Sequence, residues 1–169
     1  MKQRKLEPAV QTLAFTVPTA GVGQGHTVDL SQAASLVNRR FYRQGINWVV
    51  SGFRFFRAGT APTAGTGVAI GKLPNTWVMA NAWEKGFRHW QELNKRAIEA
   101  GESLPGRFTD FKVYMDATHH QAVQWNLLPT DADATPAAAG EWVYSKIILP
   151  DTTITGNARE REIIAVGGN

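Results

Sequence analysis

The longest regular pattern of apolar and polar positions lies in residues 76–100. Its apolar residues recur at steps of three and four, which places them along one side of a helix; they are Trp77, Ala80, Trp83, Phe87, Trp90, Leu93 and Ala97. Asn75 or Thr76 can cap the start of this helix, and Gly101 can take the left-handed conformation that often ends one. No other segment predicts a helix of similar length, so we expect a sheet or a neighbouring subunit to bury the apolar side.

The opposite side of this predicted helix is charged. Glu84, Arg88, Glu92 and Arg96 follow one another at steps of four. Oppositely charged residues at this spacing support a helix by about 0.2–0.5 kcal/mol per pair. We therefore expect this side to face water.

About seven shorter segments show the alternation or the composition of strands: residues 13–19, 26–30, 46–57, 68–72, 107–116, 141–150 and 160–167. Residues 46–57 are apolar on both faces, which is typical of a central strand. Residues 107–116 alternate, which predicts Phe111, Val113 and Met115 on a buried face and Asp110, Lys112, Tyr114 and Asp116 on a wet one.

A short helix is predicted for residues 31–40, with Asp29 or Ser31 as its cap. Many short strands separated by Gly- and Pro-rich turns are typical of a sandwich or barrel. The sequence therefore predicts a mainly β protein, an antiparallel β-sandwich with the long helix inserted and a short helix near the N-terminus. We expect residues 1–12 to form a mobile basic arm and residues 13–169 to form a single domain.

Composition excludes several classes of chemistry. The chain of 169 residues has no cysteine, which excludes disulfides, thiolate metal sites and cysteine nucleophiles. No apolar run approaches the 18 or more residues of a membrane span, and the basic start has no apolar stretch behind it. We expect neither a membrane span nor a secretion signal.

Positive charge is concentrated near the N-terminus. The formal net charge is +4, yet Lys and Arg exceed Asp and Glu by six within the first 57 residues. This asymmetry fits contact with a polyanion such as nucleic acid, and it equally fits a solvated surface. Arg39, Arg40 and Arg43 interleave with Phe41 and Tyr42, a composition that suits phosphate and base contacts or, as we prefer, a subunit interface.

Candidates for catalysis are few. His119 and His120 lie near Asp116, but adjacent histidines on a strand point to opposite faces, so they can hold one metal ion only if the chain turns sharply. No Gly-x-Ser-x-Gly motif is present. We assign no catalytic residue, no metal ligand and no cofactor.

Four groups of residues resemble, in their order along the chain, segments of a known family. They are NRRFYRQGINWVVSGFRFF, LPNTWVMANAWEKGFRHW, FTDFKVYMDATHH, and NLLP followed by GEWVYSKIILPD. The series resembles major capsid proteins of small tailless DNA viruses, of the environmental and phage-like kind, which build icosahedral shells from jelly-roll β-sandwiches. The resemblance implies a jelly-roll-like form of the predicted sandwich, in which the long helix would be an unusual insertion.

The resemblance also implies a function. Many copies would self-assemble into a virion shell in the host cell cytoplasm and enclose nucleic acid without sequence specificity. The residues expected to contact nucleic acid are Lys2, Arg4, Lys5, Arg39, Arg40 and Arg43. The residues expected at subunit interfaces are Phe41, Tyr42, Trp77, Trp83 and Trp90.

Two other functions fit the residues. A β-sandwich module could bind carbohydrate or a partner protein through exposed tryptophans, with Trp125 as the first candidate. An enzyme could use His119, His120 and Asp116. Self-assembly distinguishes the capsid protein from the module, and metal analysis tests the enzyme.

Overall fold

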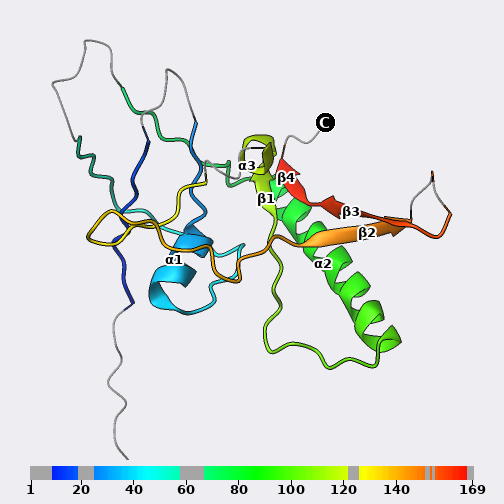
Figure 1. Cartoon of the computed structure of the whole chain (residues 1–169). Helices are drawn as coiled ribbons and strands as arrows, with labels where there is room; N and C mark the ends of the chain where they lie inside the picture. Colours follow the sequence, from blue (N-terminus) through cyan, green and yellow to red (C-terminus); the bar gives the residue numbers. More distant parts are fainter. Residues whose placement is uncertain are drawn as a thin grey trace, which may run out of the picture.

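The structure is a computed structural model that describes residues 9–18, 25–57, 67–121, 126–150, 153 and 155–166. The elements follow in the order α1 Leu30–Asn38, α2 Trp77–Ala100, β1 Tyr114–Asp116, α3 Ala117–Gln121, β2 Lys146–Pro150, β3 Ala158–Glu162 and β4 Ile164–Val166. Figure 1 shows α1 apart from α2, with β1 and β4 at the upper end of α2.

The short helix α1 confirms the prediction for residues 31–40, including its cap. The Asp29 carboxylate accepts hydrogen bonds from the backbone N–H groups of Ser31 at 2.9 Å and Gln32 at 3.2 Å. These bonds satisfy donors that the first turn of a helix leaves without partners. The helix ends where Arg39 takes a left-handed conformation, with φ of 49°.

The long helix α2 is confirmed, and Thr76 caps it by accepting a hydrogen bond from the Met79 N–H at 3.3 Å. The expected left-handed conformation at Gly101 is wrong, because Gly101 has φ of −94°. Glu102 takes it instead, with φ of 49°, and the Ser103 N–H donates to the Ile98 carbonyl at 3.1 Å. The left-handed turn therefore comes one residue later than predicted, in the position that closes a Schellman motif.

The charged side of α2 carries two of the expected ion pairs, Arg88 with Glu84 at 2.8 Å and Arg96 with Glu92 at 3.1 Å. Of the two covers expected for the apolar side, a sheet or a neighbouring subunit, this chain supplies only a partial one. No residue of α2 is buried, because this helix meets only a small part of the chain, chiefly at Phe111 and β4. Trp83 and Trp90 are half-buried, and Trp77 is 80 % exposed.

The strands form two small sheets. β1 pairs in parallel with β4, with Tyr114 opposite Ile164 and Asp116 opposite Val166. β2 pairs with β3 in an antiparallel ribbon whose register runs from Lys146 opposite Glu162 to Pro150 opposite Ala158. The ribbon projects from the body of the molecule (Figure 1).

The predicted jelly-roll-like β-sandwich is wrong. The described residues hold two sheets of two strands each, and the described parts of 13–19, 46–57 and 68–72 belong to neither sheet. These segments have the residues that strands prefer. A strand, however, also needs a neighbour for its backbone N–H and C=O groups, and local preference does not supply that neighbour.

The apolar core is small. Among the described residues, the buried apolar ones are Ala33, Ala34, Phe111, Val113, Tyr114 and Pro129. Many large apolar side chains of the described residues are exposed instead, among them Val49, Phe56 and Leu104. Much of the described apolar surface is therefore left in contact with solvent.

The predicted wet face of residues 107–116 is wrong in its centre. Lys112 and Tyr114 are buried together with Phe111 and Val113. The four consecutive residues are enclosed on both sides because α2 covers Phe111 while α1 and the loop after it approach from the other side. Alternation therefore does not set burial in this segment, since both faces have neighbours.

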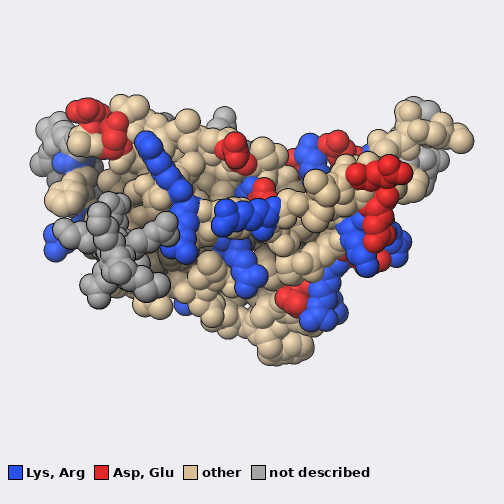
Figure 2. All heavy atoms as spheres, turned by 90° about the horizontal axis from the view of Figure 1, so that it is seen from below, with Lys and Arg blue, Asp and Glu red and all other residues tan. Residues whose placement is uncertain are grey.

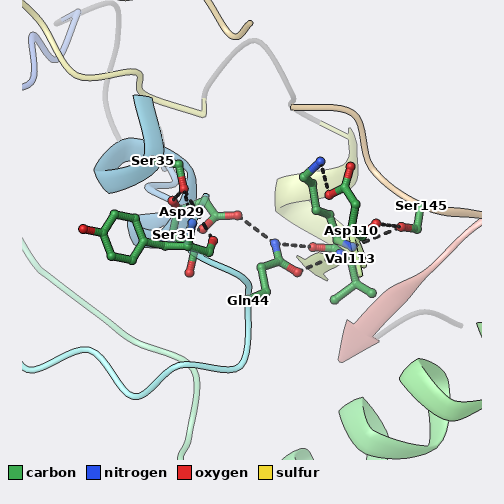
Figure 3. A network of polar contacts seen from close by, with 9 residues as sticks. Asp29, Ser31, Ser35, Gln44, Asp110, Val113 and Ser145 are labelled. Carbon is green, nitrogen blue, oxygen red and sulfur yellow. Dashed lines mark hydrogen bonds and ion pairs between the residues drawn. The ribbon is translucent and has the colours of Figure 1, made fainter. Parts of the chain in front are cut away.

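Gln44 joins the start of α1 to Val113, the residue before β1, and it is fully buried. Its side-chain NH₂ donates to the Asp29 carboxylate at 2.8 Å and to the Val113 carbonyl at 3.1 Å, while its Oε1 accepts from the Val113 N–H at 2.7 Å. Figure 3 shows the Gln44 side chain between the start of α1 and the backbone of Val113. The amide thus pairs with Val113 as a neighbouring strand would.

Replacing Gln44 tests this connection. Gln44→Ala leaves the Asp29 carboxylate and both backbone groups of Val113 without these partners, so we expect the free energy of unfolding to fall by about 2–4 kcal/mol in urea denaturation. Gln91→Ala, on the exposed surface of α2, is the control and should change it by less than about 0.5 kcal/mol. Equal stability of the two variants would show that Gln44 does not hold the two elements together.

Candidate functional site

The basic cluster follows the end of α1. The side chains of Arg39, Arg40 and Arg43 are exposed, and the Arg40 guanidinium lies 5.8 Å from the centre of the Tyr42 ring. Ser35 fastens this loop to α1, because its hydroxyl accepts a hydrogen bond from the Tyr42 N–H at 2.9 Å. The three arginines are therefore presented to solvent by a loop that is itself held in place.

Charge is unevenly spread over the surface. Figure 2 shows basic side chains standing out from the middle of one face, whereas acidic and basic side chains are mixed at the end where β2 and β3 lie. On that ribbon Lys146 pairs with Glu160 at 2.7 Å. Lys2, Arg4 and Lys5 lie outside the described residues, so the cluster after α1 is the described part of the predicted nucleic-acid contact.

Phe41 and Tyr42, predicted at a subunit interface, are half-buried within this chain. The Phe41 ring lies 5.9 Å from that of Phe108 and 6.3 Å from that of Trp142, and the Tyr42 ring lies 5.7 Å from that of Trp48. These internal contacts bury much of the surface of both rings. Little of either side chain remains for a partner.

Lys112 lies beneath the same aromatic rings and is only 2 % exposed. Its ammonium group is 4.8 Å from the Trp142 ring and 5.7 Å from the Phe41 ring, and it forms an ion pair with Asp110. Cation–π contacts and a carboxylate partner compensate for the loss of hydration when an ammonium is buried. Sequence reasoning missed this arrangement, because an alternating strand placed Lys112 in water.

The tryptophans of α2 differ in their surroundings. Trp83 lies 5.5 Å from Phe111 between ring centres and stacks on Phe87 at 5.1 Å, and Trp90 also lies 5.5 Å from Phe111. Trp77, at the start of the helix, is 80 % exposed. Of the three predicted interface tryptophans, Trp77 thus offers the most surface to a partner.

Residues 46–57 form a run of exposed apolar side chains within the part of the chain that the structure describes. Val49 is 93 % exposed and Phe56 is 90 % exposed. Ile46, Trp48, Val50, Phe53 and Phe55 are also exposed, so an apolar side chain stands in solvent at most positions of this segment. The sequence identified these residues as strongly apolar but predicted them in a core, because only the fold decides what covers them.

His119 and His120 lie on α3, a single helical turn, and not on a strand. Asp116 caps this turn by accepting a hydrogen bond from the His119 N–H at 2.7 Å. His119 is buried and its ring contacts Tyr144 and the Met115 N–H, whereas His120 pairs with Glu162 at 2.5 Å. The two imidazoles therefore contact different residues and do not converge on one site.

The contacts of His119 set its protonation state. The Met115 N–H donates to Nδ1 at 3.2 Å, so Nδ1 has no proton and Nε2 carries one, which it donates to the Tyr144 hydroxyl at 2.8 Å. Burial lowers the pKa of His119 and raises the pKa of Tyr144 above its usual range. This neutral pair holds α3 against the residues before β2 and has the geometry of a structural contact.

A cavity of 330 Å³ lies next to this pair, between α1 and the start of β2. Most of its polar lining groups already have partners: Asn126 donates to Gln32 at 2.7 Å, Lys146 pairs with Glu160, and Glu162 pairs with His120. A ligand would have to displace these contacts to bind polar groups here. The cavity therefore does not define a binding site.

In the part of the chain that the structure describes, no group of three His, Asp or Glu side chains is placed to hold a metal ion. None of the described helices is both long and apolar enough to span a membrane. Trp125, the first candidate for ligand binding, lies outside the described residues. Of the surfaces discussed above, the arginine cluster, Trp77 and residues 46–57 remain exposed to a partner.

The lowered pKa of His119 predicts a pH dependence of stability. The unfolded chain takes up a proton near pH 6.5 whereas the folded chain resists it, so stability should be steady above about pH 6.5 and fall below it by up to about 1.4 kcal/mol per pH unit, until the folded state is protonated too. Urea denaturation between pH 5 and 7.5 measures this fall. His119→Gln should remove it and His89→Gln, in an exposed residue of α2, should keep it; an unchanged slope in His119→Gln would contradict the assignment.

A comparison with known proteins finds no family model, no curated protein and no solved structure that matches the chain. The resemblance to capsid proteins therefore stays a prediction from the sequence. The function must be inferred from the surfaces that the chain itself presents.

Proposed function

We propose that this protein is a viral structural subunit, many copies of which associate into a shell around nucleic acid. The observation that carries the proposal is the apolar surface of residues 46–57 and of Trp77, which this chain leaves uncovered. The resemblance of its segments to capsid proteins of small tailless DNA viruses points to the same function. The proposal concerns assembly and does not depend on a jelly-roll fold.

The free energy available from this surface is large. Burying apolar surface contributes about 25 cal/mol per Å², and a large aromatic side chain offers about 150–250 Å². Phe56 at 90 % exposed and Trp77 at 80 % exposed would thus contribute several kcal/mol each when covered. Monomeric soluble proteins rarely leave such a surface in water, so a partner copy is the simplest cover.

In a closed shell, the same apolar contacts are repeated between many neighbouring subunits. Each subunit in a symmetric assembly repeats the same interfaces with several neighbours, so that contacts of modest strength add up through multivalency. The arginines after α1 remain exposed. They suit contact with phosphates on the inner side of a shell, where binding needs charge but no base specificity.

Assembly is tested on the purified protein by electron microscopy and light scattering. We expect particles or large oligomers in the wild type. A protein that stays monomeric at every salt concentration would contradict the proposal.

The variant Trp77→Glu tests whether Trp77 lies at the interface between copies. The side chain is 80 % exposed, and an acidic residue in the first turn of a helix is favourable, so the fold of the monomer should not suffer. Loss of the indole and gain of a charge should raise the protein concentration needed for assembly at least tenfold, measured by light scattering. Asn94→Glu, exposed on α2, should leave it unchanged; equal behaviour of the two variants would remove Trp77 from the interface.

The nucleic-acid contact is tested through its salt dependence. Replacing Arg39, Arg40 and Arg43 together by Gln should weaken retention of DNA and lower the slope of log affinity against log salt by up to about 3. Affinity measured by fluorescence anisotropy at several salt concentrations gives this slope. The matched control replaces three exposed cations of α2, Lys85, Arg88 and Lys95, by Gln. A loss of equal size in the control would show that only net charge matters.

A further inference from the structure

Residues 46–57 have an exposed backbone as well as exposed side chains. Among the described residues, no backbone hydrogen bond is made by this segment, either within itself or to residues 67–72. The segment contains no proline, so every residue has an N–H group to donate. A chain with free N–H and C=O groups and strand-forming residues is a template on which another strand can pair.

The centre of the segment leaves room for a second backbone. A Cβ atom placed on Gly52 would meet nothing within 4 Å. Glycine inside a strand pattern often marks a point where another backbone approaches closely. The open space at Gly52 therefore allows a neighbouring strand to lie alongside.

The exposed area suits a partner of protein size. Phe53, Phe55 and Phe56 are 60 %, 61 % and 90 % exposed, which corresponds to about 400 Å² between them. That is about half of the roughly 800 Å² that one partner contributes to a standard interface. The remaining apolar side chains of the segment supply more, so the segment alone approaches the size of a stable contact.

Charge selects the direction of pairing. Arg54 and Arg57 stand near one end of the segment, which contains no Asp or Glu. Two copies side by side in parallel register would place each arginine beside its equivalent, which is destabilising. Antiparallel copies would place the arginines at opposite ends, next to the aromatic and aliphatic residues of the partner, where an arginine can pack on a ring.

We propose that residues 46–57 pair with the same segment of a second copy as antiparallel β-strands across a two-fold axis. This inference rests on the proposed self-assembly and names the contact that drives it. A two-fold contact of this kind is self-complementary, since the same surface serves both copies. It satisfies the free backbone groups and covers the exposed phenylalanines in one step.

A series of single cysteines tests the pairing. The natural chain has no cysteine, so a disulfide in a single-cysteine variant must join two copies. The variants are Asn47→Cys, Val49→Cys, Ser51→Cys, Phe53→Cys and Phe55→Cys, which are exposed and take every second position of the segment. The yield of disulfide dimer after mild oxidation of the assembled protein is read on a denaturing gel. Asn94→Cys, exposed on α2, is the control and should give little dimer.

Antiparallel pairing predicts a single peak in this series. At the two-fold axis the two Cβ atoms lie close enough for a disulfide, whereas two residues away each cysteine is about 13 Å from its equivalent along the strand. We therefore expect the yield to fall at least fivefold at positions on both sides of the peak. Equal yields at all five positions would indicate parallel pairing in register and would overturn the proposal.

The same samples separate this inference from the proposed function. Particles seen by electron microscopy without any disulfide peak would mean that another segment covers residues 46–57, which overturns the pairing and leaves self-assembly intact. A wild-type protein that forms no assembly would overturn both. Amide hydrogen exchange gives a second measurement, because the amides of residues 46–57 should become protected only when the copies associate.

Discussion

The structure depends on one buried side chain amide. Gln44 is enclosed at the point where the loop after α1 meets the residues before β1, and it binds the Asp29 carboxylate on one side and both backbone groups of Val113 on the other. Asp29 is also the cap of α1. The start of the first helix and the central buried segment are therefore held by a single polar network, in which each bond lacks competition from water.

Gly45, the residue after Gln44, brings α2 into the same arrangement. Gly45 has φ of +85°, and a Cβ atom there would lie 3.0 Å from the Trp83 ring, so only glycine lets the loop approach α2 this closely. Trp83 in turn packs on Phe111, which is buried next to Lys112 and Val113. Two consecutive residues, Gln44 and Gly45, thus bring α1, β1 and α2 together.

The aromatic residues of this protein fall into two populations with different roles. One population is internal: the rings of Phe41 and Trp142 lie against the buried Lys112, and Phe111 lies in the core. The other population is exposed to solvent and includes Phe53, Phe56 and Trp77. The first population explains how a small core tolerates a buried charge. The second population, the exposed aromatic residues, is unfavourable in an isolated chain because its apolar surface contacts water. It is the physical basis for proposing that copies of the protein associate.

The elements whose signals are local could be predicted from the sequence. Both longer helices and the ion pairs of α2 follow from spacing within a few residues, and each cap is narrowed to two candidates, of which the structure shows Asp29 and Thr76. The tertiary arrangement determines which strand-like segments have partners, why Lys112 and Gln44 are buried, and why His119 and His120 contact different residues. Strand pairing and burial depend on residues distant in the chain, so neither the apolar composition of residues 46–57 nor the alternation of residues 107–116 could reveal their neighbours.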